Sequence, residues 1–313
     1  MRYNTDSKRE RGITMKDNQL NMNRATQFAV NSKQELENLD SLIGMDDYKA
    51  AMRQIIATQK RMIIAYSKGR SIRSPSFHMC FLGNPGTGKT SVSHKTADIL
   101  YRAGIVDSDK LLVAGRSDLV GEHVGETAIK TKKLLKKALG GVLLIDEAYA
   151  LMDDREGSYG DEAINTLVEE MESCRDNLVI IFAGYPNRMK HFLTNNPGLQ
   201  SRIPYTVHFQ DYTSDQLYNI AEKFAEEDGY SFHPAVREKL ISIFDIAKKD
   251  PEFGNARYAR NVIERAEAVK SDRIDIMDIL KLSDDDLFQL TPEDFVSIVT
   301  VKEYAGEKKI GFY

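Results

Sequence analysis

One stretch constrains the fold of this chain more than any other. Residues 83–90 read Gly-Asn-Pro-Gly-Thr-Gly-Lys-Thr and match the pattern G-x-x-x-x-G-K-[ST]. A short apolar segment at 78–82 precedes them, as expected for a buried strand, and residues 91–101 continue with the pattern of a helix. A glycine-rich turn between a strand and a helix can direct backbone N–H groups at phosphate oxygens, and the helix N-terminus adds the positive end of its dipole. The stretch therefore predicts a phosphate-binding loop and a nucleoside triphosphate ligand.

The residue types within this loop predict separate roles. Lys89 is expected to reach the terminal phosphates and act in catalysis, and the Thr90 hydroxyl is expected to bind Mg²⁺. A glycine-rich turn without a ligand is the structural alternative, and the strand and helix on either side argue against it. The residues predicted to contact the nucleotide here are Gly83, Asn84, Pro85, Gly86, Thr87, Gly88, Lys89, Thr90 and Ser91.

A second pattern lies at 142–147, where four apolar residues are followed by Asp146 and Glu147. The apolar run shows no alternation, which is typical of a central parallel strand covered on both faces, a Walker B strand. Ligands bind at the carboxyl ends of such strands, so Asp146 is expected to hold Mg²⁺ and Glu147 to polarise the attacking water. Glu147 is also expected to point the other way from Asp146, because side chains alternate along a strand. Two acids that simply begin a solvated loop are the alternative.

Composition limits the class of protein. A chain of 313 residues can hold one large and one smaller domain, and its net charge of −4 argues against a protein built chiefly to coat nucleic acid. Its two cysteines, Cys80 and Cys174, predict reduced, inert thiols in a cytoplasmic protein. No apolar run approaches the roughly 20 residues of a membrane span, and residues 1–16 lack the apolar block of a secretory signal. The six histidines show no paired spacing for a structural metal.

Strands and helices alternate along the middle of the chain. Such alternation predicts an α/β fold with a parallel sheet covered by helices on both faces. Besides 78–82 and 142–145, the segments read as strands are 110–114, 178–183 and 205–209, the last of them nearer the sheet edge because it alternates. Further helices are expected over 48–67, 127–139, 161–174 and 189–194.

From residue 211 the pattern becomes helical, and no further strand is expected. Thr213 and Gln216 form a capping box, and the helix that they open should end before Gly229. Helices are also expected from 233 toward 249, over 256–269 and after 291. The predicted domains are a flexible polar arm (1–36), a nucleotide-binding core (37–210), a small all-helical lid (211–295) and a C-terminal tail (296–313).

The order of these motifs resembles the AAA+ ATPases, and more narrowly the group that includes CbbX, the rubisco activase of red-type systems, the sporulation protein SpoVK and the EccA ATPases of type VII secretion. The resemblance covers roughly residues 37 to 295. It implies a P-loop core with a parallel five-stranded sheet, a helical lid, hydrolysis of ATP with Mg²⁺, and assembly into rings that are usually hexameric. The segments that carry it are 42–44, 83–90, 118–127, 140–149, 183–185, 196–202 and 254–257.

The resemblance also implies roles for two arginines. Arg202 is similar to the arginine finger that enters the neighbouring subunit's site, where its guanidinium would stabilise charge on the γ-phosphoryl oxygens. Arg257 is similar to the sensor-2 arginine of the lid, which would contact phosphate in the same subunit and act in catalysis. Its neighbour Arg260 is interpreted as a helix-surface ion pair with Glu264.

Two further segments are compared with the nucleotide site of that group. The segment with Ile43 and Gly44 resembles the wall of the adenine pocket, but apolar residues that open a helical region can equally be core. Tyr185 stands in the sensor-1 position at the end of the fourth core strand, where the wider family has another polar residue. Either Tyr185 or Asn187 is a candidate to position water.

The loop that resembles pore loop 1 departs from the family at one position. Its candidate client-contacting residues are Glu122, His123, Val124 and Gly125. His123 stands where an aromatic residue is common, and imidazole offers less apolar area and titrates near neutrality, so a weaker or pH-dependent grip is expected. The acidic loop at 153–160 is either a second pore loop or a solvated connection.

These observations lead to an expected function. We expect an ATP-driven motor in which hydrolysis at subunit interfaces moves the lid against the core and shifts central loops that pull on a protein client. The alternative is a nucleotide-dependent assembly or regulatory switch that recruits partners without threading, for which His123 would be expendable. A nucleic-acid motor is disfavoured by the acidic net charge and by the lack of a basic aromatic platform. The expected partners are ATP and ADP, further copies of this chain and a client that the sequence does not identify; no membrane insertion is expected.

Overall fold

The computed structural model describes residues 39–70, 74–123, 125–152, 159–251, 253–275 and 282–298. Its contacts divide the chain into two compact units. We call the first the sheet unit (Met1–Leu42, Asp46–Leu82 and Thr90–His208) and the second the helical unit (Ile43–Met45, Gly83–Lys89 and Phe209–Tyr313). The predicted arm, residues 1–36, and most of the predicted tail lie outside the described residues, so the domain limits remain predictions.

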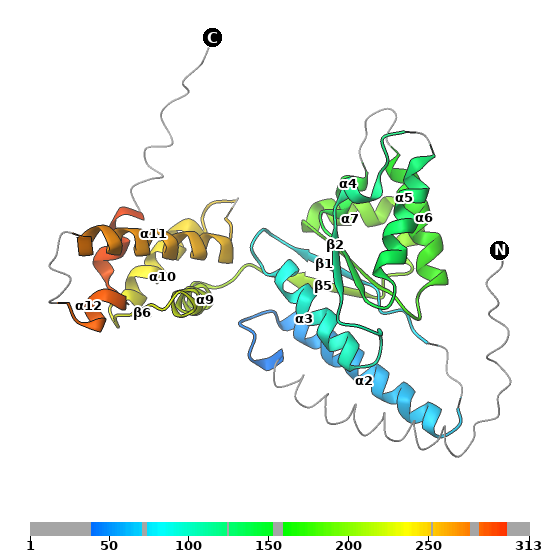
Figure 1. Cartoon of the computed structure of the whole chain (residues 1–313), viewed down its shortest axis with the longest axis horizontal. Helices are drawn as coiled ribbons and strands as arrows, with labels where there is room; N and C mark the ends of the chain where they lie inside the picture. Colours follow the sequence, from blue (N-terminus) through cyan, green and yellow to red (C-terminus); the bar gives the residue numbers. More distant parts are fainter. Residues whose placement is uncertain are drawn as a thin grey trace, which may run out of the picture. The chain divides into compact units, whose positions relative to one another are not determined.

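A five-stranded sheet forms the centre of the sheet unit, in the order β2-β3-β4-β1-β5 (Figure 1). Its strands are β1 (Met79–Gly83), β2 (Leu111–Ala114), β3 (Val142–Ile145), β4 (Val179–Gly184) and β5 (Tyr205–Phe209). Every residue of β1, β3 and β4 is buried, whereas β2 and β5 at the edges have exposed positions. The ladders β2–β3, β3–β4 and β1–β4 are parallel. The predicted parallel sheet is confirmed, and the alternating segment does form an edge strand.

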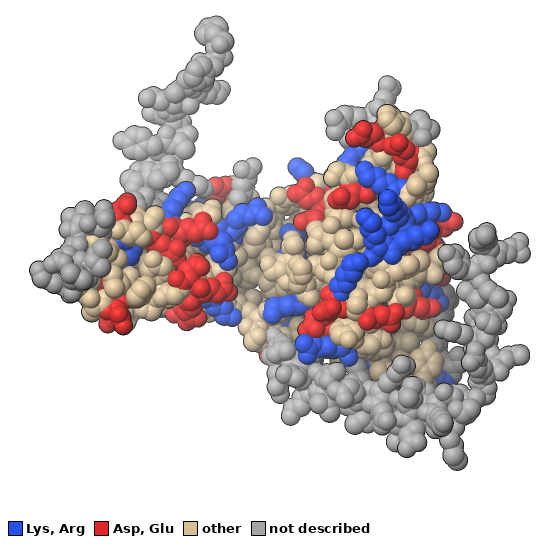
Figure 2. Space-filling view, in the orientation of Figure 1, with Lys and Arg blue, Asp and Glu red and all other residues tan. Residues whose placement is uncertain are grey.

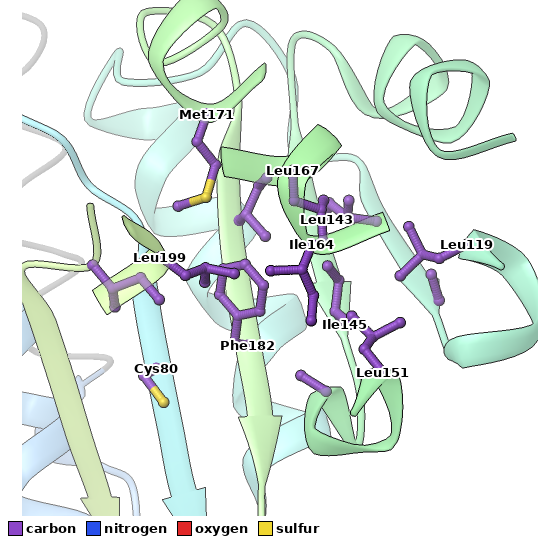
Figure 3. Packing of buried hydrophobic residues seen from close by; sticks show 14 of the residues in the cluster. Cys80, Leu119, Leu143, Ile145, Leu151, Ile164, Leu167, Met171, Phe182 and Leu199 are labelled. Carbon is purple, nitrogen blue, oxygen red and sulfur yellow. The ribbon is translucent and has the colours of Figure 1, made fainter. Parts of the chain in front are cut away.

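Helices cover both faces of this sheet. On one face, strand side chains such as Leu143, Ile145 and Phe182 pack against Ile164 and Leu167 (Figure 3). On the other face, the ring of Tyr48 meets Phe81 edge-on at 6.1 Å, and its hydroxyl is 3.0 Å from the Thr96 hydroxyl. The helices of the unit are α2 (Asp46–Ser67), α3 (Lys89–Arg102), α4 (Arg116–Leu119), α5 (Glu126–Ala138), α6 (Gly160–Ser173), α7 (Pro186–Asn195) and α8 (Pro197–Gln200), with the 3₁₀ helix η2 (Ala148–Leu151).

Three longer helices and several short elements build the helical unit. Its core joins Leu217, Leu240, Phe244, Val262 and Phe295, all of them buried. Phe295, the last residue of the predicted lid, is therefore part of the core of this unit. The elements are α9 (Ser214–Glu227), α10 (Val236–Ala247), α11 (Ala256–Asp275), α12 (Asp284–Phe288) and the 3₁₀ helix η4 (Pro292–Ile298), with the strands β6 (Ser231–Phe232) and β7 (Gln289–Leu290).

The capping box predicted at the start of this unit is confirmed. The Gln216 N–H donates to the Thr213 hydroxyl at 3.1 Å, and the Thr213 N–H donates to the Gln216 side chain at 2.9 Å. The expectation of no further strand was wrong, because β6 and β7 pair in parallel. Each of these strands has two residues, too few to show the apolar run or the alternation by which strands are recognised.

On the face drawn in Figure 2, basic and acidic side chains are interspersed. Basic side chains gather over α5 (Figure 2), whose lysines are Lys130, Lys132, Lys133, Lys136 and Lys137. Lys132 lies within 4 Å of the carboxylates of Glu169 and Glu170 on α6. Among the described helices, none is long and apolar enough to cross a membrane.

Candidate functional site

The predicted phosphate-binding loop connects the end of β1 at Gly83 to the start of α3 at Lys89. The strand–loop–helix context is therefore confirmed. Gly86 and Gly88 have φ values of +68° and +92°, in the left-handed region that glycine adopts without strain. Left-handed residues within a tight loop turn successive N–H groups toward one concave side, which forms an anion-binding nest.

The backbone carbonyls of this loop are held by hydrogen bonds from donors within the helical unit. Lys89 Nζ donates to the Gly83 and Asn84 carbonyls, at 2.8 Å each. Asn255 Nδ2 donates to the Pro85 carbonyl at 3.2 Å, and the Ala256 N–H donates to the Gly86 carbonyl at 3.1 Å. The Tyr212 hydroxyl donates to the Thr87 carbonyl at 3.2 Å. Because each of these carbonyls has a donor, the peptide planes of the loop are fixed before any ligand arrives.

This geometry fits the phosphates of a nucleotide. The nest provides N–H donors, and the N-terminus of α3 follows at once. The Lys89 ammonium lies against the loop backbone, where it donates to two carbonyls of the loop that would surround a phosphate. Within the described part of the chain, no group of three His, Cys, Asp or Glu side chains could hold a metal. A Mg²⁺ ion at such a site would take ligands from the Thr90 hydroxyl, a carboxylate and the phosphates themselves, as Mg²⁺ commonly does in nucleotide sites.

The two acids after β3 lie in a turn. The Asp146 N–H donates to the Ala114 carbonyl at 2.9 Å, which fixes the start of the turn beside β2. The Glu147 N–H donates to Asp146 Oδ1 at 3.0 Å. The strand ends at Ile145, so the alternation expected to direct Glu147 away from Asp146 does not reach either residue, and the direction of the Glu147 side chain remains a prediction. Glu147 instead has a left-handed backbone, with φ 49° and ψ 44°.

A left-handed backbone is strained for a side chain such as glutamate. Residues of this kind cost about 1–3 kcal/mol each and cluster at functional sites. Asp146 and Glu147 also border a cavity of about 730 Å³, a size typical of small-molecule sites. The other residues lining this cavity are Gly115, Arg116, Ser117, Val120, Gly121, Glu122, Lys130 and Ala150.

The cations of this cavity are held in place by backbone carbonyls. Arg116 Nη1 donates to the Ala150 carbonyl at 2.8 Å, and Lys130 Nζ donates to the Ser117 carbonyl at 2.7 Å. The cavity wall therefore combines three carboxylates, those of Glu122, Asp146 and Glu147, with two positioned cations. Such a wall can bind a polar, charged ligand beside Asp146 and Glu147.

Tyr185, the candidate sensor-1 residue, belongs to a small aromatic cluster. Its ring lies 5.9 Å from the ring of Tyr149, and the guanidinium of Arg188 lies 5.1 Å from the Tyr149 ring and 5.6 Å from the Tyr185 ring. Burial, and next the charge of Glu147, raises the pKa of Tyr149. The sequence analysis missed Arg188, although its spacing of three residues from Tyr185 at the start of a helix could have suggested the contact.

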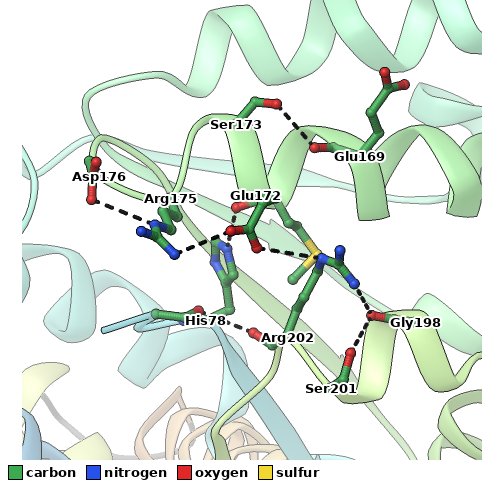
Figure 4. Close-up of polar contacts among 11 residues, drawn as sticks. His78, Glu169, Glu172, Ser173, Arg175, Asp176, Gly198, Ser201 and Arg202 are labelled. Carbon is green, nitrogen blue, oxygen red and sulfur yellow. Dashed lines mark hydrogen bonds and ion pairs between the residues drawn. The ribbon is translucent and has the colours of Figure 1, made fainter. Parts of the chain in front are cut away.

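Arg202, the candidate arginine finger, has its contacts within the sheet unit (Figure 4). Its Nη1 donates to the Gly198 carbonyl at 2.9 Å, and its Nε lies 3.9 Å from Glu172 Oε2. The side chain is 32% exposed, and Glu172 also pairs with Arg175. A shared, partly exposed pair at this distance contributes little energy, so Arg202 can be drawn away by a stronger anion.

Arg257 and the adenine-pocket candidates lie in the helical unit. Arg257 is the second residue of α11 and is exposed, beside the Ala256 N–H that holds the loop. Ile43 packs against the core of this unit, in agreement with the interpretation of that segment as core. Gly44 has φ +63°, and a Cβ there would lie 3.0 Å from Gln216 Nε2. Contact of Ile43 and Gly44 with adenine remains a prediction.

Arg260 has a different partner from the one expected. It pairs with Glu227 of α9 at 3.8 Å, and its guanidinium lies 4.1 Å from the centre of the Phe224 ring. The expected pair with Glu264 on the same helix was wrong, because the packing of α11 on α9 places an aromatic face and a carboxylate within reach.

The candidate pore loop is only partly described. His123 is exposed, and its N–H donates to the Glu126 carboxylate at 3.3 Å. Glu122 is exposed, and Gly125 precedes α5 with φ +82°. Val124 lies outside the described residues, as does most of the acidic loop, residues 153–158. A role for this loop in client contact therefore remains a prediction.

Both cysteines carry protonated thiols near neutral pH. Burial raises the pKa of Cys80 to about 12. Burial and the charge of Glu170 raise the pKa of Cys174, which is half-buried. Since the thiolate is the reactive form, neither group is suited to nucleophilic chemistry.

The chain matches two families of known domains. Residues 79–210 match the "ATPase family associated with various cellular activities (AAA)", and residues 213–304 match the "AAA lid domain". Among solved structures, the AAA domain of FIGL-1 in complex with ADP superposes with a TM-score of 0.58 at 19% identity, over 85% of this chain and 88% of that one. A Thermotoga maritima RuvB mutant gives a TM-score of 0.55 at 17% identity, over 84% of this chain and 72% of that one. These structures share the fold.

Curated relatives are more similar in sequence. The chloroplastic ribulose bisphosphate carboxylase/oxygenase activase of Cyanidioschyzon merolae is 42% identical over 91% of this chain and 98% of its own length. Protein CbbX of Cereibacter sphaeroides is 42% identical over 78% of this chain and 79% of its own length. The fold, the P-loop, the lid and this identity over most of the chain lead to one conclusion: the chain belongs to the AAA+ family of ATP-hydrolysing enzymes, in the group of CbbX and its relatives.

Proposed function

We propose that this ATPase is a remodelling motor that works as a ring, with six copies as the expected number, and acts on a protein client. The observation that carries the proposal is the phosphate-binding loop, whose carbonyls are fixed by donors of the helical unit. Energy from the nucleotide can reach the lid through these contacts, because they join the loop to residues of the lid.

The roles of the site residues follow from their chemistry. Lys89 and the N–H groups of the loop bind the phosphates, and the Thr90 hydroxyl and Asp146 hold the metal. Glu147 accepts a proton from the attacking water. Bound Mg·ATP supplies the phosphoanhydride bond and the Lewis acid. Arg257 contacts phosphate from the same subunit.

Arg202 acts in the site of a neighbouring copy. Its pair with Glu172 is long and partly exposed, so it contributes little energy. The guanidinium can therefore leave Glu172 at low cost and pair with the phosphate in the adjoining subunit. Delivery of this cation from a neighbour makes hydrolysis depend on assembly. A ring of copies is therefore the form in which the site is complete.

The client that we propose first is ribulose bisphosphate carboxylase/oxygenase, because the relative that matches 91% of this chain is named as its activase. The compartment that we propose is the cytoplasm or the plastid stroma. Such reducing compartments keep thiols such as Cys80 and Cys174 unpaired.

The substitution Glu147→Gln tests the proposed roles. It keeps the shape of the side chain and removes the base, so we expect ATP binding within about twofold of the wild type and turnover reduced by on the order of 100-fold or more. ATP binding is measured by calorimetry and turnover by phosphate release. The matched control is Glu169→Gln, an exposed glutamate on α6, which should leave both values unchanged.

Two outcomes would contradict parts of this proposal. Unchanged turnover in the Glu147→Gln protein would remove Glu147 from the chemistry. The same variant, which should retain ATP, is also the form in which we expect a ring of copies by native mass spectrometry. A monomer with ATP bound would contradict assembly as a requirement.

A further inference from the structure

The side chains of Asn84, Asp211 and Asn255 form a connected polar network within the helical unit. Asn84 Nδ2 donates to both carboxylate oxygens of Asp211, at 3.1 and 3.0 Å. Asn255 Nδ2 donates to Asp211 Oδ1 at 2.7 Å. These residues come from the phosphate-binding loop, from the start of the lid and from the turn before α11, and the carboxylate of Asp211 joins the other two.

Asn255 uses its whole side-chain amide in this network. Besides Asp211, its Nδ2 donates to the Pro85 carbonyl at 3.2 Å, and its Oδ1 accepts from the Tyr212 N–H at 3.0 Å. The residue is completely buried and has φ +48°. Asparagine combines tolerance of the left-handed region with two donors and one acceptor, whereas aspartate lacks the donors and glycine lacks the side chain.

The backbone beside Asn255 is as close to the loop as its side chain. The Ala256 N–H donates to the Gly86 carbonyl, and a Cβ at Gly86 would lie 2.0 Å from the Gly254 carbonyl oxygen. The same turn opens α11, which carries Arg257 as its second residue. Any displacement of this turn therefore moves both the loop backbone and the position of Arg257.

We propose that Asn84, Asp211 and Asn255 form a polar latch that holds the phosphate-binding loop in its receptive shape and sets its position relative to Arg257. They are positioning residues, since they act through the loop backbone and through α11. The latch transmits a change at the phosphates to the lid and a change of the lid to the loop. This inference rests on the proposed function, because it takes the loop as the nucleotide site.

The network can be broken and restored by isosteric exchange. Asp211→Asn places an amide donor opposite the Asn84 amide, and Asn84→Asp places a carboxylate opposite Asp211. Each single change therefore weakens the pair: Asn84→Asp sets two negative charges against each other, and Asp211→Asn replaces one acceptor oxygen of the carboxylate by a donor. In the double variant Asn84→Asp/Asp211→Asn, the new amide at 211 donates to the new carboxylate at 84 and still accepts from Asn255. The matched control is Asp215→Asn, an exposed aspartate of α9 paired with Arg237.

Two measurements are made on the full chain. Without nucleotide, hydrogen exchange of the loop amides at 83–89 should be about fivefold faster in each single variant, the factor expected for a loss of about 1 kcal/mol. The dissociation constant for ADP should rise by a similar factor of about five. The double variant should return to within about twofold of the wild type in both, and Asp215→Asn should change neither.

Each contrary result has a distinct meaning. Unchanged exchange in the single variants, or no recovery in the double variant, overturns the latch. Faster exchange with unchanged affinity for ADP shows that the network shapes the loop without positioning it for phosphate, which overturns the positioning role. If the wild type binds no ADP while exchange shows the break and its recovery, the latch stands and the proposed function fails.

Discussion

The turn that follows β3 and the turn that precedes α11 each hold a non-glycine residue in the left-handed region, and they hold it differently. Glu147 has φ 49° in the sheet unit, and Asn255 has φ 48° in the helical unit. The Asn255 side chain makes three hydrogen bonds that offset the strain, with Pro85, Asp211 and Tyr212. The contacts that fix the Glu147 turn are made by backbone N–H groups, so its carboxylate is available for chemistry.

This difference separates two ways to build a site. The loop depends on side chains distant in sequence, and its shape is a property of the whole helical unit. The acidic turn depends on the end of a buried strand and on a left-handed backbone at Glu147 that costs stability. Substitutions in the loop are therefore expected to disturb structure and binding together, whereas substitutions of Glu147 are expected to separate stability from activity.

The largest effect is expected for Gly86→Ala. The residue needs a left-handed backbone, and its Cβ would lie 2.0 Å from the Gly254 carbonyl oxygen, so the loop must move away from α11. We expect the affinity for ADP, measured by calorimetry, to fall on the order of 100-fold. Gly229→Ala is the control, because Gly229 has φ +85° with nothing within 4 Å of the added atom. Equal effects of the two substitutions on ADP binding would show that strain alone matters.

A second prediction concerns acid and the sheet unit. His78 is buried, accepts from the Ile180 N–H at Nδ1, and has its Nε2 3.4 Å from the Met171 carbonyl. Burial lowers its pKa from 6.5 to about 4. The unfolded chain takes up a proton near pH 6.5 and the folded chain only near pH 4, so acid favours unfolding. Stability should fall by about 3 kcal/mol from this group alone as the pH drops from 6.5 to about 4.

Urea unfolding at pH 7 and at pH 5 checks this prediction in the wild type and in His78→Gln. Glutamine keeps a donor and an acceptor and does not titrate in this range. Carboxylates titrate in both proteins, so the difference between their pH dependences is the quantity of interest. Identical pH dependences would mean that the pKa of His78 is the same in the folded and the unfolded chain, which would contradict the prediction.

The smallest effects on the free energy of unfolding come from glycine at the two left-handed turns, and they should have opposite signs. Asn255→Gly relieves the strain but removes three hydrogen bonds, so we expect a net loss of about 2 kcal/mol. Glu147→Gly relieves strain and removes no side-chain bond that holds the turn, so we expect a gain of about 0.5–1 kcal/mol while ATP turnover is abolished. Chemical denaturation measures both. A loss of stability in Glu147→Gly would show that its carboxylate supports the fold.

Much of the fold could be predicted from local patterns. The central strands β1, β3 and β4 are continuous apolar runs, and the start of α9 carries its own capping box. The two-residue strands β6 and β7 left no such pattern. Arg260 showed a possible partner on its own helix, but its contact with α9 depends on packing that a single sequence does not display.

The site shows the same limit. Spacing and residue type were enough to select Lys89, Thr90, Asp146 and Glu147 as candidates. The hydrogen bonds of the latch span 127 residues between Asn84 and Asp211 and 170 between Pro85 and Asn255. The sequence analysis included Asn255 in a motif without a role, since no local pattern predicts a partner at such a distance.

The central claim is that the phosphate-binding loop, whose carbonyls accept hydrogen bonds from residues of the lid, binds the phosphates of a nucleotide together with Mg²⁺. Calorimetric titration of the full chain with ATP, with and without Mg²⁺, tests it most directly, with Lys89→Ala as the comparison. We expect saturable binding in the wild type that strengthens when Mg²⁺ is present and is lost in Lys89→Ala. An absence of saturable binding in the wild type, or equal binding in the two proteins, would contradict the account.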